Sequence, residues 1–378
     1  MLINTEKVRL YFSETLKLFS YRIGQQEQFK SALADFLGIN SDNIFLFASA
    51  RGALSFLLRS IAKTGGKILI PAGDAVDLSN GFEWGKGAVQ RISSKEGRAA
   101  IKCDKDDVAV VTYPLGLPLN GLLLTEARDK CFTVEYAPDA FGMEIEHRKV
   151  GTLGDFSVFS LAYDKSFSSL LGGVLICNNA EYMLQIKREY TKLRQLPDMQ
   201  FVLRYSVFIL KSILSGYLFR RMKHWLRIFL FYFTGGLGAR IFEAPRKTTL
   251  KEIYKYPHYL SNLALEQLSL FPNRRDELFE NANVVYNNLK YKFDIVWPDS
   301  AGGKMTNAAI TKIVFRDLTF KERFRLITKG IYLRHLLKEE NGKQPHLYLL
   351  ENKVEYKSED LAYIISCFEK LRPRNAEE

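Results

Sequence analysis

Between Asn43 and Cys177 the chain alternates short runs of β-branched and aromatic residues with helical stretches, and this alternation constrains the fold most strongly. The strand-like runs are FLFA, KILI, VAVVTY, CFTVEY, FSVFSL and GVLIC, with Gly, Pro or Asp between them. Strands joined by helices pair in parallel and are covered by helices on both faces. We therefore predict an α/β fold with a mostly parallel sheet, whose ligands bind at the carboxyl ends of the strands.

The segments on either side of this region are predicted to be mainly helical, with a few further strands. Amphipathic helices are expected near Leu10–Phe19 and over Gln25–Leu37, and a longer helix over Leu260–Asn288 with a kink or break at Pro272. The runs FDIVW, ITKIVF and HLYLL predict strands. A terminal helix is expected from Ser358 to Leu371, with Ser358, Glu359 and Asp360 as a favourable N-cap.

A chain of 378 residues exceeds what one hydrophobic core commonly supports, so we expect more than one domain. The predicted division is an N-terminal arm with a large α/β domain over residues 1–199, an insertion over 200–247, and a long helical stretch with a small α+β domain over 248–378.

The net charge of +12 is concentrated in one window. Between Lys187 and Lys247 there are 13 Lys and Arg residues against 3 acidic residues, a surplus of 10 that leaves only +2 for the rest of the chain. The same window holds the apolar runs FVLRYSVFIL, SILSGYLF and WLRIFLFYF. Long aliphatic runs are not the spaced aromatics of a nucleic-acid groove, so no nucleic-acid partner is predicted.

Each apolar run is shorter than the ~20 residues that a membrane-spanning helix needs. Placing Arg220, Arg221 or Arg227 at mid-bilayer would cost roughly 2.5 to 3.5 kcal/mol per residue. We instead predict a pair of helices, broken near Ser215 and Gly216, that lies on an anionic membrane surface over residues 201–235. The alternative is a helical hairpin buried in a homodimer interface.

The cysteines and histidines predict neither a disulfide framework nor a metal site. Cys103, Cys131, Cys177 and Cys367 are far apart and contain no CxxC pair, which is typical of buried thiols in a reducing cytoplasm. The five histidines show no ligand spacing, so no metal is expected.

One stretch carries a family resemblance. The residues Val150–Lys165 (VGTLGDFSVFSLAYDK), followed by Gly172 and Gly173, resemble the VGTxGDxxxFSFxxxK…GG block of the DegT/DnrJ/EryC1/StrS family of sugar aminotransferases. Phe47–Leu54 (FASARGAL) resembles the SGTxAL turn of that family, and KILIPA, YPLGLP and YLSNL are similar to further family segments. The resemblance covers nearly the whole chain except the basic window.

This resemblance implies a fold-type-I transferase with a seven-stranded sheet, the cofactor pyridoxal 5'-phosphate and a homodimer. It implies that Lys165 is the catalytic lysine that forms the Schiff base, and that Ser160 bonds the cofactor phosphate. Ser49, Ala50 and Arg51 would hold the same phosphate at the start of a helix, where backbone amides and the helix dipole favour an anion.

The chain departs from the family at several cofactor contacts. Tyr136 stands where the family has the aspartate that pairs with the pyridine nitrogen, and Asp139 stands where it has a glutamine. Ala75 replaces an aromatic residue that stacks on the ring, and Leu171 replaces a glutamate before the double glycine. Tyr136 and Asp139 are nevertheless the residues we expect nearest the ring.

Two functions follow from these matches and departures. The first is an aminotransferase that takes nitrogen from a small amino donor and gives it to a nucleotide- or lipid-linked keto sugar in cell-surface glycan synthesis. The second is a non-catalytic homologue that serves as a membrane-associated partner in the same synthesis. Both readings predict a cytoplasmic protein at the inner face of the membrane.

Overall fold

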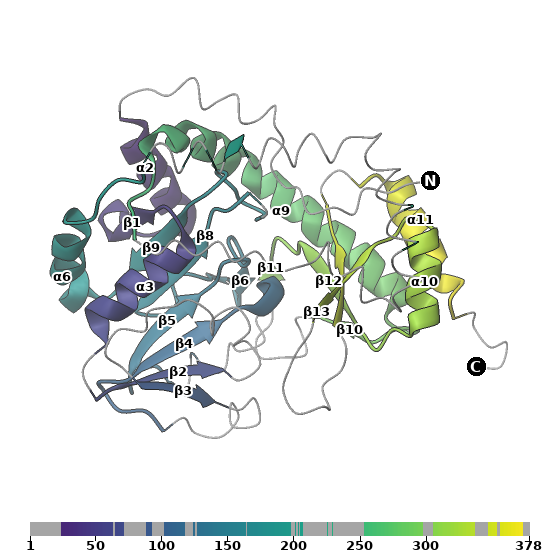
Figure 1. Cartoon of the computed structure of the whole chain (residues 1–378), viewed down its shortest axis with the longest axis horizontal. Coiled ribbons are helices and arrows are strands. Elements are labelled where there is room, and N and C mark those ends of the chain that lie inside the picture. The colour runs from purple at the N-terminus through teal and green to yellow at the C-terminus, as the bar shows by residue number, and fades with distance from the viewer. Residues whose placement is uncertain are drawn as a thin grey trace.

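The computed structural model describes residues 24–62, 65–71, 88–92, 102–117, 124, 127–163, 165–197, 201, 203, 205–206, 225, 229, 253–297, 305–336, 347–353 and 356–372. Two sheets lie at opposite ends of the long helix α9 (Ser261–Leu289), which runs past both of them (Figure 1). The predicted helix at Leu10–Phe19 and most of the basic window, including Ser215 and Gly216, lie outside the described residues.

The larger sheet has seven strands in the order β1-β9-β8-β5-β4-β2-β3. Its strands are β1 (Ile44–Phe47), β2 (Lys67–Pro71), β3 (Ala88–Ile92), β4 (Val108–Thr112), β5 (Phe132–Tyr136), β8 (Phe156–Ser160) and β9 (Gly173–Cys177). Pairing is parallel from β3 through to β8, and β9 is antiparallel to both of its neighbours. The predicted α/β fold with a mostly parallel sheet is therefore confirmed.

Helices cover both faces of this sheet because its strands are apolar on both sides. In β1, Phe45 and Phe47 pack in a core with α3 (Ala50–Ile61) and α6 (Ala180–Thr191), whereas Ile44 and Leu46 pack in a core with α2 (Gln25–Leu37) and α9. Successive side chains of a strand point to opposite faces, so one short run supplies both cores. The bounds of α2 match the helix expected from the sequence.

The smaller sheet has four antiparallel strands in the order β10-β12-β14-β13. Its strands are β10 (Ile295–Val296), β12 (Lys312–Arg316), β13 (Leu333–Leu336) and β14 (Leu347–Glu351), and α10 (Phe320–Thr328) and α11 (Ser358–Glu369) lie beside it (Figure 1). A third, short sheet joins β11 (Met305–Asn307) to β6 (Glu144–Ile145) and β7 (Arg148–Lys149), and so links the two halves of the chain.

Helix α9 is continuous through Pro272, so the chain has no break there; buried Phe271 and Leu278 on either side hold both halves against the core. The expected N-cap of the terminal helix was wrong. Helix α11 begins with Ser358 as its first helical residue and not as its N-cap; the backbone N–H of Lys357 donates to the Asp360 carboxylate at 3.1 Å. The strand β3 lies in a segment for which no strand was expected.

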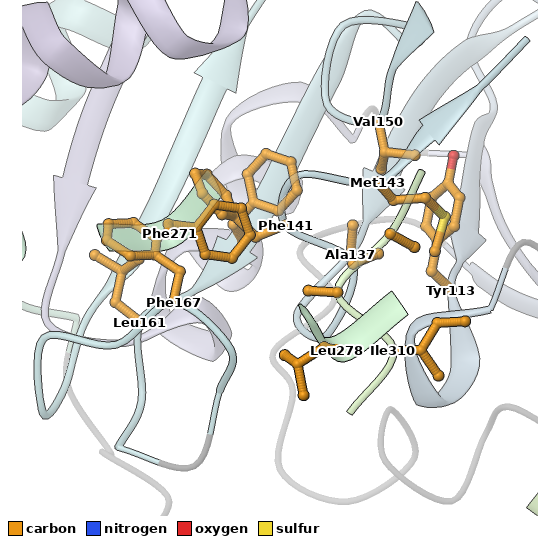
Figure 2. Close-up of a cluster of buried hydrophobic side chains, with 14 of the residues drawn as sticks. Tyr113, Ala137, Phe141, Met143, Val150, Leu161, Phe167, Phe271, Leu278 and Ile310 are labelled. Carbon is orange, nitrogen blue, oxygen red and sulfur yellow. The ribbon is translucent and has the colours of Figure 1, made fainter. Parts of the chain in front are cut away.

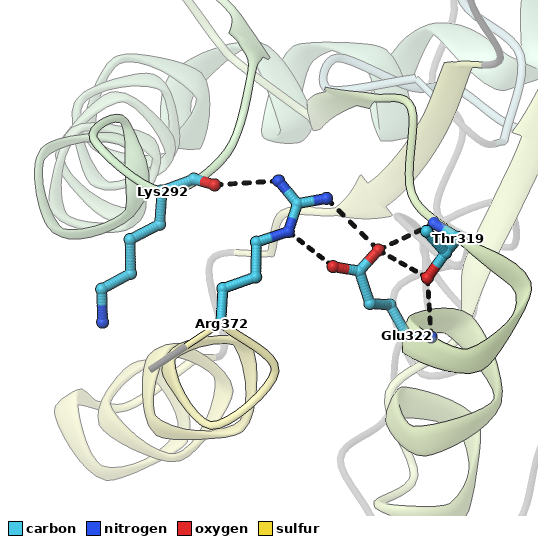
Figure 3. A network of polar contacts seen from close by, with 4 residues as sticks. All are labelled: Lys292, Thr319, Glu322 and Arg372. Atoms are coloured by element: carbon cyan, nitrogen blue, oxygen red, sulfur yellow. Dashed lines mark hydrogen bonds and ion pairs between the residues drawn. The ribbon is translucent and has the colours of Figure 1, made fainter. Parts of the chain in front are cut away.

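A polar network ties the last described residues to the smaller sheet's helices (Figure 3). Arg372 donates to both carboxylate oxygens of Glu322 and to the carbonyl of Lys292. The same carboxylate accepts from the backbone N–H of Thr319 at 2.7 Å, which forms a capping box at the start of α10. Burial opposes ionisation of Glu322, but the bonds from Arg372 and Thr319 outweigh it and hold the pKa of this carboxyl below its usual range.

The variant Glu322→Gln is expected to lower the free energy of unfolding at neutral pH by about 1 to 3 kcal/mol, since it weakens charge-assisted hydrogen bonds. Because the folded-state pKa of Glu322 is depressed, its contribution is present above the unfolded-state pKa of about 4.3 and is lost as the pH falls through the folded-state value. Urea titrations at several pH values should therefore show the two proteins converge in acid. The exposed Glu359 of α11 provides the control Glu359→Gln, and a deficit of Glu322→Gln that stays constant with pH would contradict the assignment.

Candidate active site

Lys165 lies in the loop between β8 and β9, at the carboxyl end of β8. Backbone hydrogen bonds hold this loop: Leu161 donates to Gly172 at 3.0 Å, Tyr163 to Leu170 at 3.0 Å, and Lys165 to Ala162 at 3.0 Å. These bonds continue the β8–β9 pairing beyond the strands. The hydrogen-bonded end of the β8–β9 hairpin therefore positions Lys165 at the edge of the sheet where α/β folds bind their ligands.

The amine of Lys165 makes an ion pair with Asp139. The distance from Nζ to Oδ1 is 2.9 Å, and the two side chains are only 14% and 15% exposed. Lys312, on β12 of the smaller sheet, places its Nζ 3.1 Å from the same oxygen and is 4% exposed. One carboxylate oxygen thus lies between two ammonium groups that come from different sheets.

Phe141, Phe167 and Phe271 pack together in a buried cluster (Figure 2). Phe141 lies two residues after Asp139 and Phe167 two residues after Lys165, and their ring centroids are 4.5 Å apart. Phe271 of α9 packs edge-on against Phe141 at 4.9 Å. Contact between the two phenyl rings therefore brings the turn after β5 and the loop after β8 together and fixes both to α9.

The beginning of helix α3 lies against the same hairpin. Ser49 caps the helix by accepting from the backbone N–H of Gly52 at 3.0 Å, and it forms an isolated β-bridge with Gly172. A Cβ added at Gly173 would lie 2.4 Å from the backbone nitrogen of Ala50, so only glycine permits this close approach. Because Ser160 pairs with Gly173 across β8 and β9, Ser49, Ala50 and Ser160 all lie beside this glycine.

The remaining predicted residues lie on the same elements. Arg51 is half-buried in the first turn of α3. Tyr136 ends β5, is 7% exposed, and packs in the core between the sheet and α3. Leu171 is buried next to the double glycine, and Ala75 lies outside the described residues.

Glu135, one residue before Tyr136, is fully buried and holds the loop that precedes β8. Its carboxylate accepts five hydrogen bonds, from Tyr113 Oη, Ser157 Oγ and the backbone N–H groups of Gly151, Leu153 and Gly154. Burial and then the adjacent charge and hydrogen bond of Glu135 raise the pKa of Tyr113 well above its usual range. The glycines of the GTLGD motif therefore donate backbone hydrogen bonds to a carboxylate with a structural role. Most of that motif stabilises the loop before β8.

Sequence reasoning did not identify Lys312 as a site residue. Its side chain points to the opposite face of β12 from Ile313 and Phe315, which pack in the core with α2 and α9. The one sequence feature that could have indicated a functional role is a lysine in a strand whose neighbouring residues are buried. Its ion pair with Asp139, however, depends on a tertiary contact between residues 173 positions apart, which strand periodicity does not report.

We compared the chain with protein-family models, curated protein sequences and solved structures. Residues 118–196 match the sequence model of the DegT/DnrJ/EryC1/StrS aminotransferase family. No curated protein sequence matches the chain. The putative sugar aminotransferase Spr1654 from Streptococcus pneumoniae, in its apo-form, superposes with a TM-score of 0.67 at 13% identity over 98% of each chain.

Two further solved structures have the same fold. The aminotransferase TlmJ from Streptoalloteichus hindustanus has a TM-score of 0.66 at 13% identity over 98% of each chain. A DegT DnrJ EryC1 StrS aminotransferase from Brucella abortus has a TM-score of 0.61 at 14% identity, over 96% of this chain and 94% of the other. The matched segment spans Glu135, Tyr136, Asp139, Ser160 and Lys165. Residues 118–196 are thus similar to the DegT/DnrJ/EryC1/StrS aminotransferase family, and the chain shares the fold of these solved structures over nearly its whole length.

Proposed function

We propose that this chain is a pyridoxal-phosphate-dependent aminotransferase that acts on a nucleotide- or lipid-linked keto sugar in glycan synthesis. The observation that carries the proposal is the amine of Lys165, which is 14% exposed at the carboxyl edge of β8 and held by the Asp139 carboxylate at 2.9 Å. A sparsely exposed lysine at a ligand-binding edge, with charged side chains close enough to control its protonation, is a candidate for amine-based covalent catalysis.

The residues of the described site fit the cofactor. Ser160 and the start of α3, with Ser49, Ala50 and Arg51, adjoin the Lys165 hairpin through the close contact between Gly173 and Ala50. We assign the cofactor phosphate to these groups, because a helix N-terminus and hydroxyls favour an anion. The phosphate end and the lysine end of the cofactor would therefore meet neighbouring parts of one hairpin.

Pyridoxal phosphate, when bound, supplies the carbonyl and the electron-withdrawing ring that amino transfer requires. Lys165 contributes the amine that anchors the group and later moves a proton at the reacting carbon of the substrate. Asp139 orients that amine, and Tyr136 at the end of β5 would be the residue nearest the ring nitrogen. We further propose that the protein is a homodimer in the cytoplasm.

A second candidate function is a non-catalytic homologue that retains the scaffold. The observation that favours it is the buried Tyr136, because a phenol is a poor substitute for the aspartate that keeps the ring nitrogen protonated. The same scaffold could then serve as a membrane-associated partner of glycan-synthesis enzymes.

Trapping with borohydride distinguishes the two functions. We expect purified protein mixed with pyridoxal phosphate to develop a visible absorption band, and reduction to fix a pyridoxyl group on the peptide that contains Lys165. The variant Lys165→Ala should lose both the band and the adduct. Lys255→Met provides a control, since Lys255 bonds the carbonyl of Thr191 instead of Asp139. No band and no Lys165 adduct in the unchanged protein would favour the non-catalytic homologue.

We also propose that the basic window lies on an anionic membrane surface. No helix among the described residues is long and apolar enough to cross a bilayer. Trp225 and Phe229 are 68% and 55% exposed, and their spacing of four residues places them on one face of a helix. Exposed aromatic side chains beside positive charge suit the interface between lipid headgroups and acyl chains.

Flotation with anionic liposomes tests the membrane proposal. The double variant Trp225→Ser/Phe229→Ser should reduce the bound fraction at least about tenfold, because each ring would otherwise bury apolar surface in the lipid. The control Leu184→Ser removes an apolar side chain that is 81% exposed on α6, and it should bind like the unchanged protein. Equal flotation of the double variant, and of a deletion of residues 207–233, would refute the proposal.

A further inference from the structure

Lys312 lies at the candidate active site although it belongs to the smaller sheet. Its amine is 3.1 Å from Asp139 Oδ1, the oxygen that also holds Lys165 at 2.9 Å. Two ammonium nitrogens on one oxygen are at most about 6 Å apart. Since the Lys312 side chain is 4% exposed, water screens this contact only weakly.

Hydrogen bonds from Asn352 hold the start of the strand that carries Lys312. Asn352, which is 1% exposed, donates its side-chain amide to the carbonyls of Leu278 on α9 and Ile310, both at 2.7 Å. Its backbone N–H donates to Thr311 at 2.9 Å. The residues just before Lys312 are thus fastened to the same helix that packs beneath the Lys165 loop, so the two lysines share one rigid support.

The two neighbours of the Lys165 amine act on it in opposite directions. A carboxylate at hydrogen-bond distance stabilises an ammonium, whereas a second ammonium nearby destabilises it. Only the neutral amine is a nucleophile, and an adjacent cation is one of the ways in which proteins keep a lysine amine neutral. With Asp139 as its sole strong neighbour, Lys165 would be held in its unreactive, protonated form.

We propose that Lys312 is a positioning residue that keeps the amine of Lys165 reactive by sharing Asp139 with it. Lys312 takes part of the carboxylate's charge and repels the Lys165 ammonium, so that Lys165 releases its proton at lower pH. This inference rests on the proposed function, in which that amine attacks a carbonyl. It assigns the smaller domain a direct electrostatic role at a site otherwise built from the larger one.

Charged groups near the lysine pair lie on several described elements. Asp139 follows β5, Lys312 lies on β12, and Glu351 on β14 is the cross-strand partner of Lys312 in the antiparallel register. Lys312 and Lys165 both form an ion pair with Asp139, so removing that carboxylate acts on both amines at once.

The test measures the protonation of Lys165 in the protein without added cofactor. Trace acetic anhydride at a series of pH values, followed by peptide mass spectrometry, gives the acetylation rate of the Lys165 amine; the new C–N bond releases acetate and a proton. For Lys312→Met we expect the midpoint of the rate profile to move upward by about one to two pH units. Asp139→Asn should move it downward, because two ammonium groups then face each other.

Two controls make the result specific. Lys312→Arg keeps the charge and should retain most of the original midpoint, and Lys255→Met removes a charge that is bonded to Thr191 and should leave the midpoint unchanged. A purely structural role for Lys312 predicts that both site variants drift in the same direction, toward an ordinary lysine. Such a common drift, or an unchanged or lower midpoint in Lys312→Met, would overturn the proposal. Because no cofactor takes part, failure of pyridoxal phosphate trapping remains a separate result.

Discussion

Contact between Phe141 and Phe167, with ring centroids 4.5 Å apart, is the interaction on which the site depends. Each ring lies two residues beyond a member of the Asp139–Lys165 ion pair, so the packing of two phenyl groups determines where two charges meet. Phe271 adds α9 to the same cluster, and Gly142 leaves room for that ring, since an added Cβ would lie 2.3 Å from it. The free energy of apolar packing thus offsets the desolvation penalty of the two charges, and the packing determines that they form a short ion pair.

The most recognisable motif of the chain is mainly structural. In the GTLGD segment, the amides of Gly151 and Gly154 bond Glu135, while Asp155 accepts from the N–H and hydroxyl of Thr133 at 2.9 and 2.8 Å. These bonds join the loop to β5 and so direct β8 toward the edge where Lys165 emerges. The motif thus encodes the structural support of the lysine, whereas Asp139 and Lys312, which contact its amine's ion pair, lie outside the motif.

Sequence periodicity predicted the strands of the large sheet because each one is a short apolar run whose alternate residues face two cores, as Ile44 and Phe45 do. The same reasoning failed where tertiary contacts decide the outcome. Pro272 lies in an unbroken helix because the residues around it are held by the core, and Lys312 reaches Asp139 because of how two distant parts of the chain pack. Neither a local propensity nor a spacing rule contains that information.

The departures from the family pattern at residues 136 and 139 amount to a displaced negative charge. Where the family has an aspartate, this chain has the phenol of Tyr136, and a carboxylate stands three residues later beside the lysine amine. A carboxylate in that position stabilises the protonated lysine and so opposes its reaction as a nucleophile. The second ammonium, from Lys312, opposes that effect. Asp139 and Lys312 are therefore physically coupled: Asp139 alone would hold the lysine in its protonated form, and Lys312 restores the balance of charge around it.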